Sequence, residues 1–274
     1  MWVLFAFASA FFAGVTAILA KIGIKNVNSN VATAIRTIVI LAFSWLMVFL
    51  TGADDGLAEV KARTLIFLVL SGFATGASWL CYFSALQLGD VNKVTPIDKS
   101  STVMTMILAL VILGEKITVY KLAGIILITV GTYMMITRKK TSEKTPSNIS
   151  WIVYAFLAAV FASLTSILGK IGIENVNSNL GTAIRTIVVL IMAWILVFVT
   201  GSKSELKTID RKSWLFIILS GVSTGLSWLC YYRALQTGEA SIVVSIDKLS
   251  IVLTVAFSRI FLGERLTGKA FAGL

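Results

Sequence analysis

Charged residues recur inside long apolar stretches of this sequence, where lipid would make them costly. A charge at the centre of a helix in a bilayer costs roughly 2.5–3.5 kcal/mol and usually serves a purpose. Each half of the chain has four such residues, at a constant offset of 149 positions. They are Lys21, Arg36, Asp98 and Lys99 in the first half, and Lys170, Arg185, Asp247 and Lys248 in the second. Each set has three cations and one carboxylate, so water or an anionic ligand is needed to balance it.

These residue types indicate binding and gating. A guanidinium group grips a carboxylate or a phosphate with two parallel hydrogen bonds, so Arg36 and Arg185 are candidate ligands for an anionic substrate. Asp98 or Asp247 could carry a proton, and the four lysines could take part in gating. A purely structural alternative also stands. In it the lysines extend to the membrane interface and each Asp pairs with an Arg to staple helices together.

Aromatic residues supply a second candidate set. Trp79, Tyr82, Trp228 and Tyr231 lie beside a stripe of Ser and Thr that recurs in both halves. The stripe predicts a cavity wall, with the aromatic rings stacking on a substrate or holding a cation. The alternative is ordinary helix packing, for which the pairs Gly72/Gly76 and Gly221/Gly225 have the required small-xxx-small spacing.

The elements that carry these residues are predicted to be membrane helices. The 274-residue chain is 57% hydrophobic and only 14% charged, with a mean hydropathy of +0.92. Soluble proteins have about 25% charged residues, so this chain has too few to cover a water-exposed surface. Disordered chains are excluded because they are polar and poor in aromatics. The fold class is therefore an all-α polytopic membrane protein.

Composition also limits the chemistry. The chain has no His and two Cys, so no His-ligated metal site or nucleophile–base arrangement is expected. We expect no enzyme, no metal and no cofactor. The formal net charge of +11 fits a lipid surface better than nucleic acid in so apolar a chain. The expected partners are the bilayer and a small-molecule substrate, and a homodimer is left open.

Nine apolar runs are long enough to span a bilayer, which takes about 20 residues. In the first half they are Trp2–Ile24, Val31–Leu50, Thr64–Leu86, Asn92–Leu113 and Thr118–Ile136. In the second half they are Trp151–Ile173, Leu180–Val199, Ser213–Leu235 and Ser241–Leu262, and a tenth begins near Thr267. Pro96 is expected to kink the fourth run.

The chain repeats itself. KIGIKNVNSN at Lys21–Asn30 returns as KIGIENVNSN at Lys170–Asn179. We expect a first five-helix repeat over 1–137, a basic hinge over 138–149, and a second repeat over 150–274 that lacks most of its last helix, as in a fragment of a longer chain. Five spans per repeat put the second repeat upside down relative to the first. Inverted repeats are typical of secondary transporters, whose substrate site lies between the repeats.

The repeat and its motifs resemble EamA-type members of the drug/metabolite transporter superfamily. The resemblance rests on the five-helix unit, Ala-Leu-Gln-x-Gly at Ala85–Gly89 and Ala234–Gly238, and Leu-Gly-Glu at Leu113–Glu115 and Leu262–Glu264. It implies a ten-helix inverted-repeat carrier, usually an exporter of small metabolites, with both termini in the cytoplasm. The two glutamates are expected to cap the span that follows each of them.

The functional prediction is a secondary transporter, an exporter by this resemblance, that moves a small polar or anionic metabolite by alternating access. The alternative is a translocator of lipid-linked or phosphate-bearing head groups. The expected location is the cell membrane. An excess of Lys and Arg on the hinge side places the hinge inside by the positive-inside rule, whereas the resemblance places it outside.

Overall fold

A computed structural model describes residues 1–23, 27–88, 94, 97–98, 100–116, 118–135, 150–262 and 268–273. Within these residues the protein is helical and has no strand, which confirms the all-α prediction. Seven of the described segments are long and apolar enough to cross a membrane: six continuous helices and the segment Ala240–Phe257, which contains a break. Two shorter apolar helices accompany them. The chain is therefore an integral membrane protein that crosses the bilayer several times.

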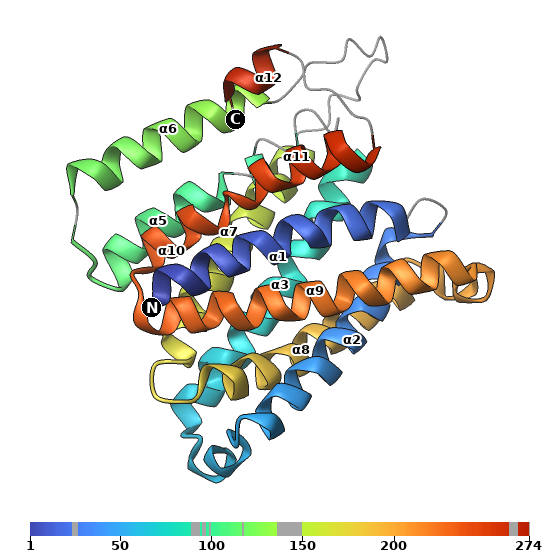
Figure 1. Cartoon of the computed structure of the whole chain (residues 1–274), viewed down its shortest axis with the longest axis horizontal. Coiled ribbons are helices and arrows are strands. Elements are labelled where there is room, and N and C mark those ends of the chain that lie inside the picture. The colour runs from blue at the N-terminus through green and yellow to red at the C-terminus, as the bar shows by residue number, and fades with distance from the viewer. Residues whose placement is uncertain are drawn as a thin grey trace.

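Most helices follow the predicted runs closely (Figure 1). The exception in the first half is the run expected over Asn92–Leu113, where the described helix α5 begins only at Ser101. In the first half they are α1 (Trp2–Gly23), α2 (Ser29–Leu50), α3 (Ala62–Leu88), α5 (Ser101–Ile112) and α6 (Val119–Met135). In the second half they are α7 (Ser150–Gly172), α8 (Ser178–Val199), α9 (Arg211–Thr237), α10 (Ala240–Asp247), α11 (Ser250–Leu262) and α12 (Gly268–Gly273). Short 3₁₀ helices, η1 (Asp54–Glu59) and η2 (Ser202–Thr208), follow α2 and α8.

The repeated Asn-Val-Asn-Ser-Asn sequence starts the second helix of each half. The side chain of Asn28 accepts a hydrogen bond from the backbone N–H of Asn30, and Asn177 does the same for Asn179, both at 2.9 Å. Such N-caps satisfy a backbone donor that the first turn of a helix leaves free. The same asparagine cap therefore begins the second helix of both halves.

The fourth span of the second half differs from the prediction. We expected one helix over Ser241–Leu262, but the helix stops at Asp247 and a new one starts at Ser250. The backbone N–H groups of Leu249 and Ile251 bond to Ile246 and Lys248, so the break is locally satisfied. Hydropathy continues across the break and could not reveal it. Pro96, the expected kink, lies outside the described residues.

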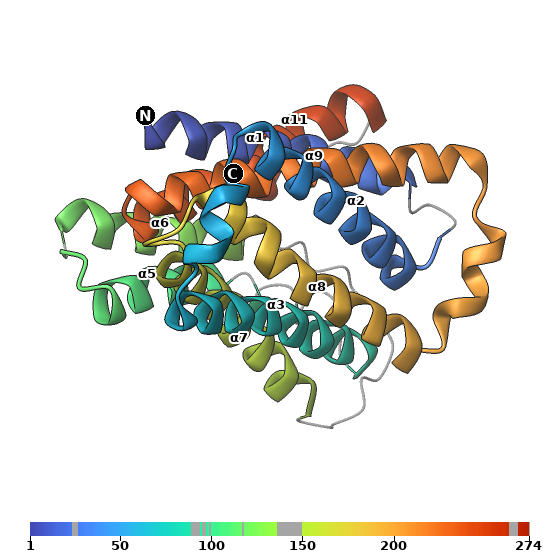
Figure 2. The ribbon, with the colours of Figure 1, turned by 90° about the horizontal axis from the view of Figure 1, so that it is seen from below.

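The two halves pack mainly on each other. Helix α1 runs along α9, and α3 runs along α7, as Figure 2 shows for the first pair. Ser227 donates a hydrogen bond to the carbonyl of Ser9, and the equivalent Ser78 donates to the carbonyl of Ala158. Most of the tightest helix contacts thus join residues that are far apart in the sequence.

Helices α2 and α8 run in opposite directions across the centre. Asn30 at the start of α2 bonds to Thr200 after the end of α8, and Asn179 at the start of α8 bonds to Thr51 after the end of α2, both at 3.3 Å. These two helices occupy equivalent places in the two halves of the sequence. Their opposite directions are what inverted halves require.

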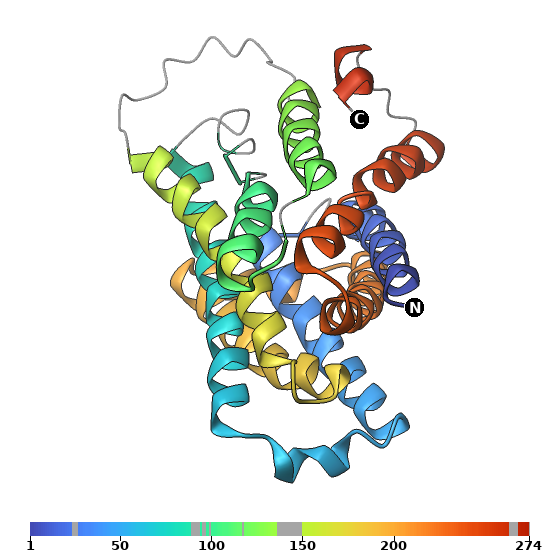
Figure 3. The same cartoon turned by 90° about the vertical axis from the view of Figure 1, so that its left-hand side faces the viewer.

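Many large apolar side chains are exposed, whereas small residues fill contacts between the helices. Helix α6 lies beside α12 at the edge opposite η1 (Figures 1 and 3). Its Tyr120 and Leu127 are 90% and 71% exposed. By contrast, Ala6, Ala10 and Ala158 are buried between helices. Close packing through small residues is how membrane helices associate, since lipid already surrounds the apolar exterior.

Candidate functional site

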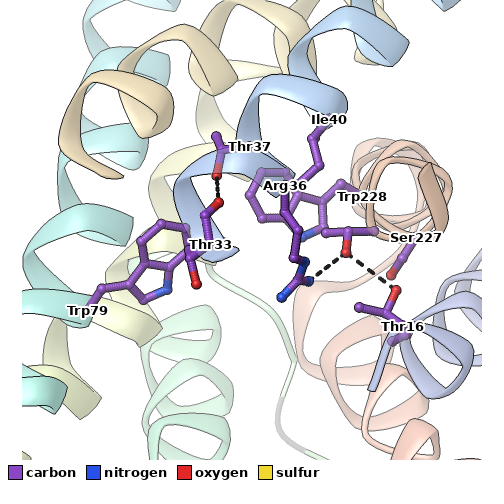
Figure 4. A pocket seen from close by; sticks show the side chains of 10 residues that line it. Thr16, Thr33, Arg36, Thr37, Ile40, Trp79, Ser227 and Trp228 are labelled. Carbon is purple, nitrogen blue, oxygen red and sulfur yellow. Dashed lines mark hydrogen bonds between the residues drawn. The ribbon is translucent and has the colours of Figure 1, made fainter. Parts of the chain in front are cut away.

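A cavity of about 330 Å³ lies between α1, α2, α3 and α9. Its wall contains Thr16 of α1, Arg36 of α2, Trp79 of α3, and Ser227 and Trp228 of α9 (Figure 4). Ligand pockets usually fall between about 300 and 1,000 Å³, so the space suits a small molecule. Three of its helices belong to the first half of the chain and one to the second.

Arg36 is the charged group of this cavity. Its Nη2 atom donates a hydrogen bond to Oγ1 of Thr224 at 2.8 Å, and that oxygen lies 3.4 Å from Oγ1 of Thr16. The Nε atom of Arg36 is buried and has no hydrogen-bond partner. No carboxylate of the described chain lies within ion-pair distance of the guanidinium. The cavity therefore holds a cation that is only partly satisfied.

Two tryptophans face the same space. Figure 4 shows Trp79 on one side of the cavity and Trp228 close to Arg36 on the other. Threonines fill much of the remaining wall, and Thr37 bonds back to the carbonyl of Thr33 at 2.8 Å. Aromatic faces, hydroxyl groups and one guanidinium are a suitable lining for a small anion with an apolar part.

Arg185, the equivalent of Arg36, is enclosed. It is 1% exposed, and its Nη2 and Nε atoms donate to Thr75 at 2.8 Å and to Ser71 at 3.3 Å. Its Cζ atom lies 5.1 Å from the ring centre of Trp228 and 4.7 Å from that of Tyr232. Cation–π contacts of this kind are worth about 2 kcal/mol or more when desolvated.

Asp247 is connected to the cavity through serines. Its Oδ1 atom accepts a hydrogen bond from Ser9 at 2.7 Å, and Ser9 lies 3.3 Å from Oγ of Ser227 in the cavity wall. No arginine of the described chain pairs with Asp247. The structural alternative from the sequence, an Asp–Arg staple, therefore does not hold at this position, which lies at the end of α10.

The other predicted residues lie apart from this cavity. Tyr231 bonds to Ser166 at 2.9 Å, and Tyr82 packs beside Ala85. Lys170 donates to the carbonyl of Gly238, Lys21 is exposed, Asp98 and Lys248 are half-buried, and Lys99 lies outside the described residues. In the second half, Lys170, Arg185 and Asp247 each have different hydrogen-bond partners.

Glu115 caps a helix of the other half of the chain. Its carboxylate accepts hydrogen bonds from the backbone N–H of Ala240 and from Ser241, at the start of α10, and pairs with Lys121 at 3.3 Å. Lys121 also pairs with Glu239 at 3.2 Å. The sequence predicted a cap for the following helix, α6. Thr118 caps α6 instead, since its Oγ1 atom accepts a hydrogen bond from the backbone N–H of Lys121 at 3.3 Å.

Sequence reasoning missed the polar residues of the first two spans that reach the cavity, such as Thr16 and Thr33, and it missed Ser9. A signal for the α1 residues was present. Ser9, Ala13 and Thr16 are small or polar and recur at helical spacing on one face of an otherwise apolar helix. The same kind of stripe drew attention to α3 and α9 because it is longer there and includes aromatic residues.

Comparison with known families agrees with this architecture. The model of the EamA-like transporter family matches residues 1–137 and 149–274. The chain belongs to the EamA-like transporter family. This family lies within the drug/metabolite transporter superfamily, so the resemblance inferred from the sequence is confirmed.

Curated relatives have transporter names without substrates. An "Uncharacterized transporter in cobO 3'region" of Sinorhizobium sp is 46% identical over 49% of this chain and 95% of its own length. An "Uncharacterized transporter" of Archaeoglobus fulgidus is 27% identical over 92% of this chain and 86% of its own length. Together with the family, these relatives show that this EamA-like protein is a membrane transporter.

A solved structure shares the fold. It superimposes with a TM-score of 0.77 over 99% of this chain and 92% of that chain, at 14% sequence identity. At this level of identity the likeness concerns the arrangement of helices alone.

Proposed function

We propose that this EamA-like protein is a secondary transporter that exports a small anionic metabolite across the cell membrane, with Arg36 as the ligand of the anionic group. The buried Nε atom of Arg36, which has no hydrogen-bond partner, carries this proposal. Leaving a buried charged group partly unpaired is costly. A carboxylate or phosphate in the cavity would accept hydrogen bonds from the free edge of the guanidinium and remove that cost.

Alternating access is part of the proposal. The halves have equivalent residues, and their helices α2 and α8 run in opposite directions. If the halves as a whole are inverted, exchanging their conformations would move the opening from one membrane face to the other. In the conformation described here the cavity takes most of its wall from the first half. The opposite conformation would take the equivalent residues from the second half.

A small metabolite is favoured over a lipid-linked head group by the cavity itself. Its volume of about 330 Å³ is near the lower end of the range for ligand pockets. It is walled by four helices, with a tryptophan on each side of the space beside Arg36 (Figure 4). A lipid-linked substrate would require a groove that opens sideways between helices.

Flux into proteoliposomes tests the function. Vesicles containing the full chain would be offered radiolabelled monocarboxylates, dicarboxylates, amino acids and sugar phosphates in turn. For the compound that accumulates, Arg36→Gln should reduce the rate at least about tenfold, the effect of losing roughly 1.4 kcal/mol of binding. Arg63→Gln, which removes an exposed arginine at the start of α3, is the matched control. Accumulation that Arg36→Gln leaves unchanged would refute the role of Arg36.

A further inference from the structure

Arg36 and Arg185 make the same hydrogen bond from equivalent positions on two antiparallel helices. Each lies seven residues after the first residue of its helix, Ser29 or Ser178, and the two helices are antiparallel. Each donates from Nη2 to a threonine of a helix in the opposite half, Thr224 or Thr75, at 2.8 Å. The two guanidinium groups thus occupy equivalent positions in the two halves of the chain.

Their surroundings differ. Arg36 lines the open cavity and has a free Nε atom. Arg185 is 1% exposed, and its Nε atom is taken up by Ser71. The rings of Trp228 and Tyr232 cover Arg185, and the sequence has Phe83 at the position equivalent to Tyr232. One arginine is open to a ligand, and its counterpart is covered by side chains.

Trp228 belongs to both environments. It lines the cavity that contains Arg36, and its ring centre lies 5.1 Å from Cζ of Arg185. The same indole ring therefore borders the cavity and covers one side of the second guanidinium. Movement of that ring would join Arg185 to the cavity without any change in the hydrogen bond to Thr75.

The charge of Arg185 has no carboxylate partner in the described chain. Two hydroxyl groups and two aromatic faces compensate it only in part, because a buried charge needs a counter-charge to recover its hydration energy. A substrate carboxylate or phosphate would supply the missing charge. The aromatic rings would then act as a cover that an anion displaces.

We propose that Arg185 is a second anion-binding position for the transported substrate, closed off in this conformation by Trp228, and that the anionic group passes from one arginine to the other as Trp228 moves. This inference rests on the proposed function, since it assumes that Arg36 holds the same anion. Arg185 is then a second position for the anion beyond Arg36, and Trp228 is the side chain between the two positions.

Thiol labelling of the purified full chain can test both arginines separately. Cys81→Ser and Cys230→Ser first remove the native thiols. Thr224→Cys then reports on the surroundings of Arg36, and Thr75→Cys reports on those of Arg185. Two reagents of similar size are compared at each position: anionic methanethiosulfonate ethylsulfonate, and its cationic trimethylammonium counterpart.

We expect Thr75→Cys to react at least about tenfold more slowly than Thr224→Cys, a difference of roughly 1.4 kcal/mol in the barrier. Adding Trp228→Ala should accelerate the reaction of Thr75→Cys about tenfold, whereas Trp79→Ala, the equivalent change in the first half, should not. In the Trp228→Ala background, Arg185→Gln should lower the anionic-to-cationic rate ratio at Thr75→Cys several-fold. Trp228→Leu serves as a second variant in case the alanine variant does not fold.

The outcomes separate this inference from the proposed function. Equal reactivity of the two cysteines, or no acceleration by either Trp228 variant, would show that Trp228 is not a barrier. A rate ratio that Arg185→Gln leaves unchanged would show that Arg185 attracts no anion. Failure of the proposed function would appear at the other cysteine, as a rate ratio at Thr224→Cys that Arg36→Gln does not change.

Discussion

At the scale of single residues, a short polar connection leads from the broken fourth span to the cavity. Asp247 accepts a hydrogen bond from Ser9, which in turn contacts Ser227 in the cavity wall. Asp247 lies where α10 ends, and Lys248 follows it. A carboxylate that is hydrogen-bonded toward a cavity can exchange a proton with whatever enters it.

Replacing Asp247 tests whether a proton moves with the substrate. We expect Asp247→Asn to abolish uptake driven by a pH gradient, because the amide cannot carry a proton, and to leave exchange of labelled for unlabelled substrate largely intact. Both rates can be measured in the same proteoliposomes. Asp210→Asn is the control, since Asp210 is an exposed helix cap. Full pH-driven uptake by Asp247→Asn would exclude this residue as the carrier.

At the scale of helices, Glu115 joins the two halves of the chain. Burial by itself would raise the pKa of Glu115, but the hydrogen bonds from Ser241, Ala240 and Lys121 outweigh it and hold the pKa below its ordinary value. The charged form is therefore the one that stabilises the start of α10. A lowered pKa means that this stabilisation is present above the pKa of the unfolded chain and is lost as the pH falls through the folded value.

Glu115→Gln should accordingly lower the midpoint of thermal unfolding. The free energy of unfolding should fall by about 1–3 kcal/mol, the usual cost of leaving buried hydrogen-bonding groups without a charged partner. The difference in unfolding midpoint between the wild type and Glu115→Gln should shrink as the pH falls below the ordinary pKa of a glutamate. Glu59→Gln, at an exposed glutamate of η1, should change nothing. Equal midpoints of wild type and Glu115→Gln at neutral pH would contradict the cap.

The paired glycines of α3 and α9 set how closely the helices that carry the arginines approach. A methyl group on Gly72 would lie 2.6 Å from Cβ of Val188 and 3.0 Å from the carbonyl oxygen of Arg185. On the equivalent Gly221 it would lie 2.8 Å from Cβ of Val39 and 3.2 Å from the carbonyl oxygen of Arg36. The packing interpretation of these glycines is thereby confirmed.

Gly221→Ala should therefore displace α2 and weaken substrate binding at Arg36. Overpacking of this kind costs about 1–3 kcal/mol. We expect a several-fold higher half-saturation concentration for transport together with a lower unfolding midpoint. Gly124→Ala is the control, because a methyl group on Gly124 meets no atom within 4 Å. Unchanged transport by a folded Gly221→Ala protein would show that the spacing of α2 and α9 does not position Arg36.

At the scale of the whole molecule, contacts between distant segments place the connections on two opposite faces. Asn28 bonds to Ser202 and Glu205, so the α1–α2 and α8–α9 connections share one face. Gly238 packs on Trp2, so the α9–α10 connection shares the other face with the start of α1.

Single cysteines at Glu205 and Glu239 should consequently react with a membrane-impermeant maleimide from opposite sides of intact cells. The variants are made in the background without native thiols, and permeabilised cells provide the measure of full labelling. The side from which Glu239→Cys is labelled also decides the membrane orientation. The Lys and Arg distribution places the 138–149 hinge inside, whereas the family implies that it lies outside. Labelling of both cysteines from the same side would refute the helix directions described here.

Hydropathy and the 149-residue repeat sufficed to predict the helical class, the family and the boundaries of most helices outside the two fourth spans, because these properties depend on local composition and on short motifs. The same reading identified Arg36, Trp79 and Trp228, since charged and aromatic residues stand out in apolar helices. It could not show that Arg36 opens to a cavity whereas Arg185, with the same neighbours in sequence, is covered.

That difference depends on tertiary contacts. The partners of Arg36 and Arg185 come from helices more than 100 residues away in the sequence. In one conformation these two equivalent arginines have different surroundings. The hydrogen bond between Ser9 and Asp247 and the cap by Glu115 also join segments that are distant in the sequence. The chain's own pattern determines which helices form in lipid, and only their packing decides which buried charge lines a cavity.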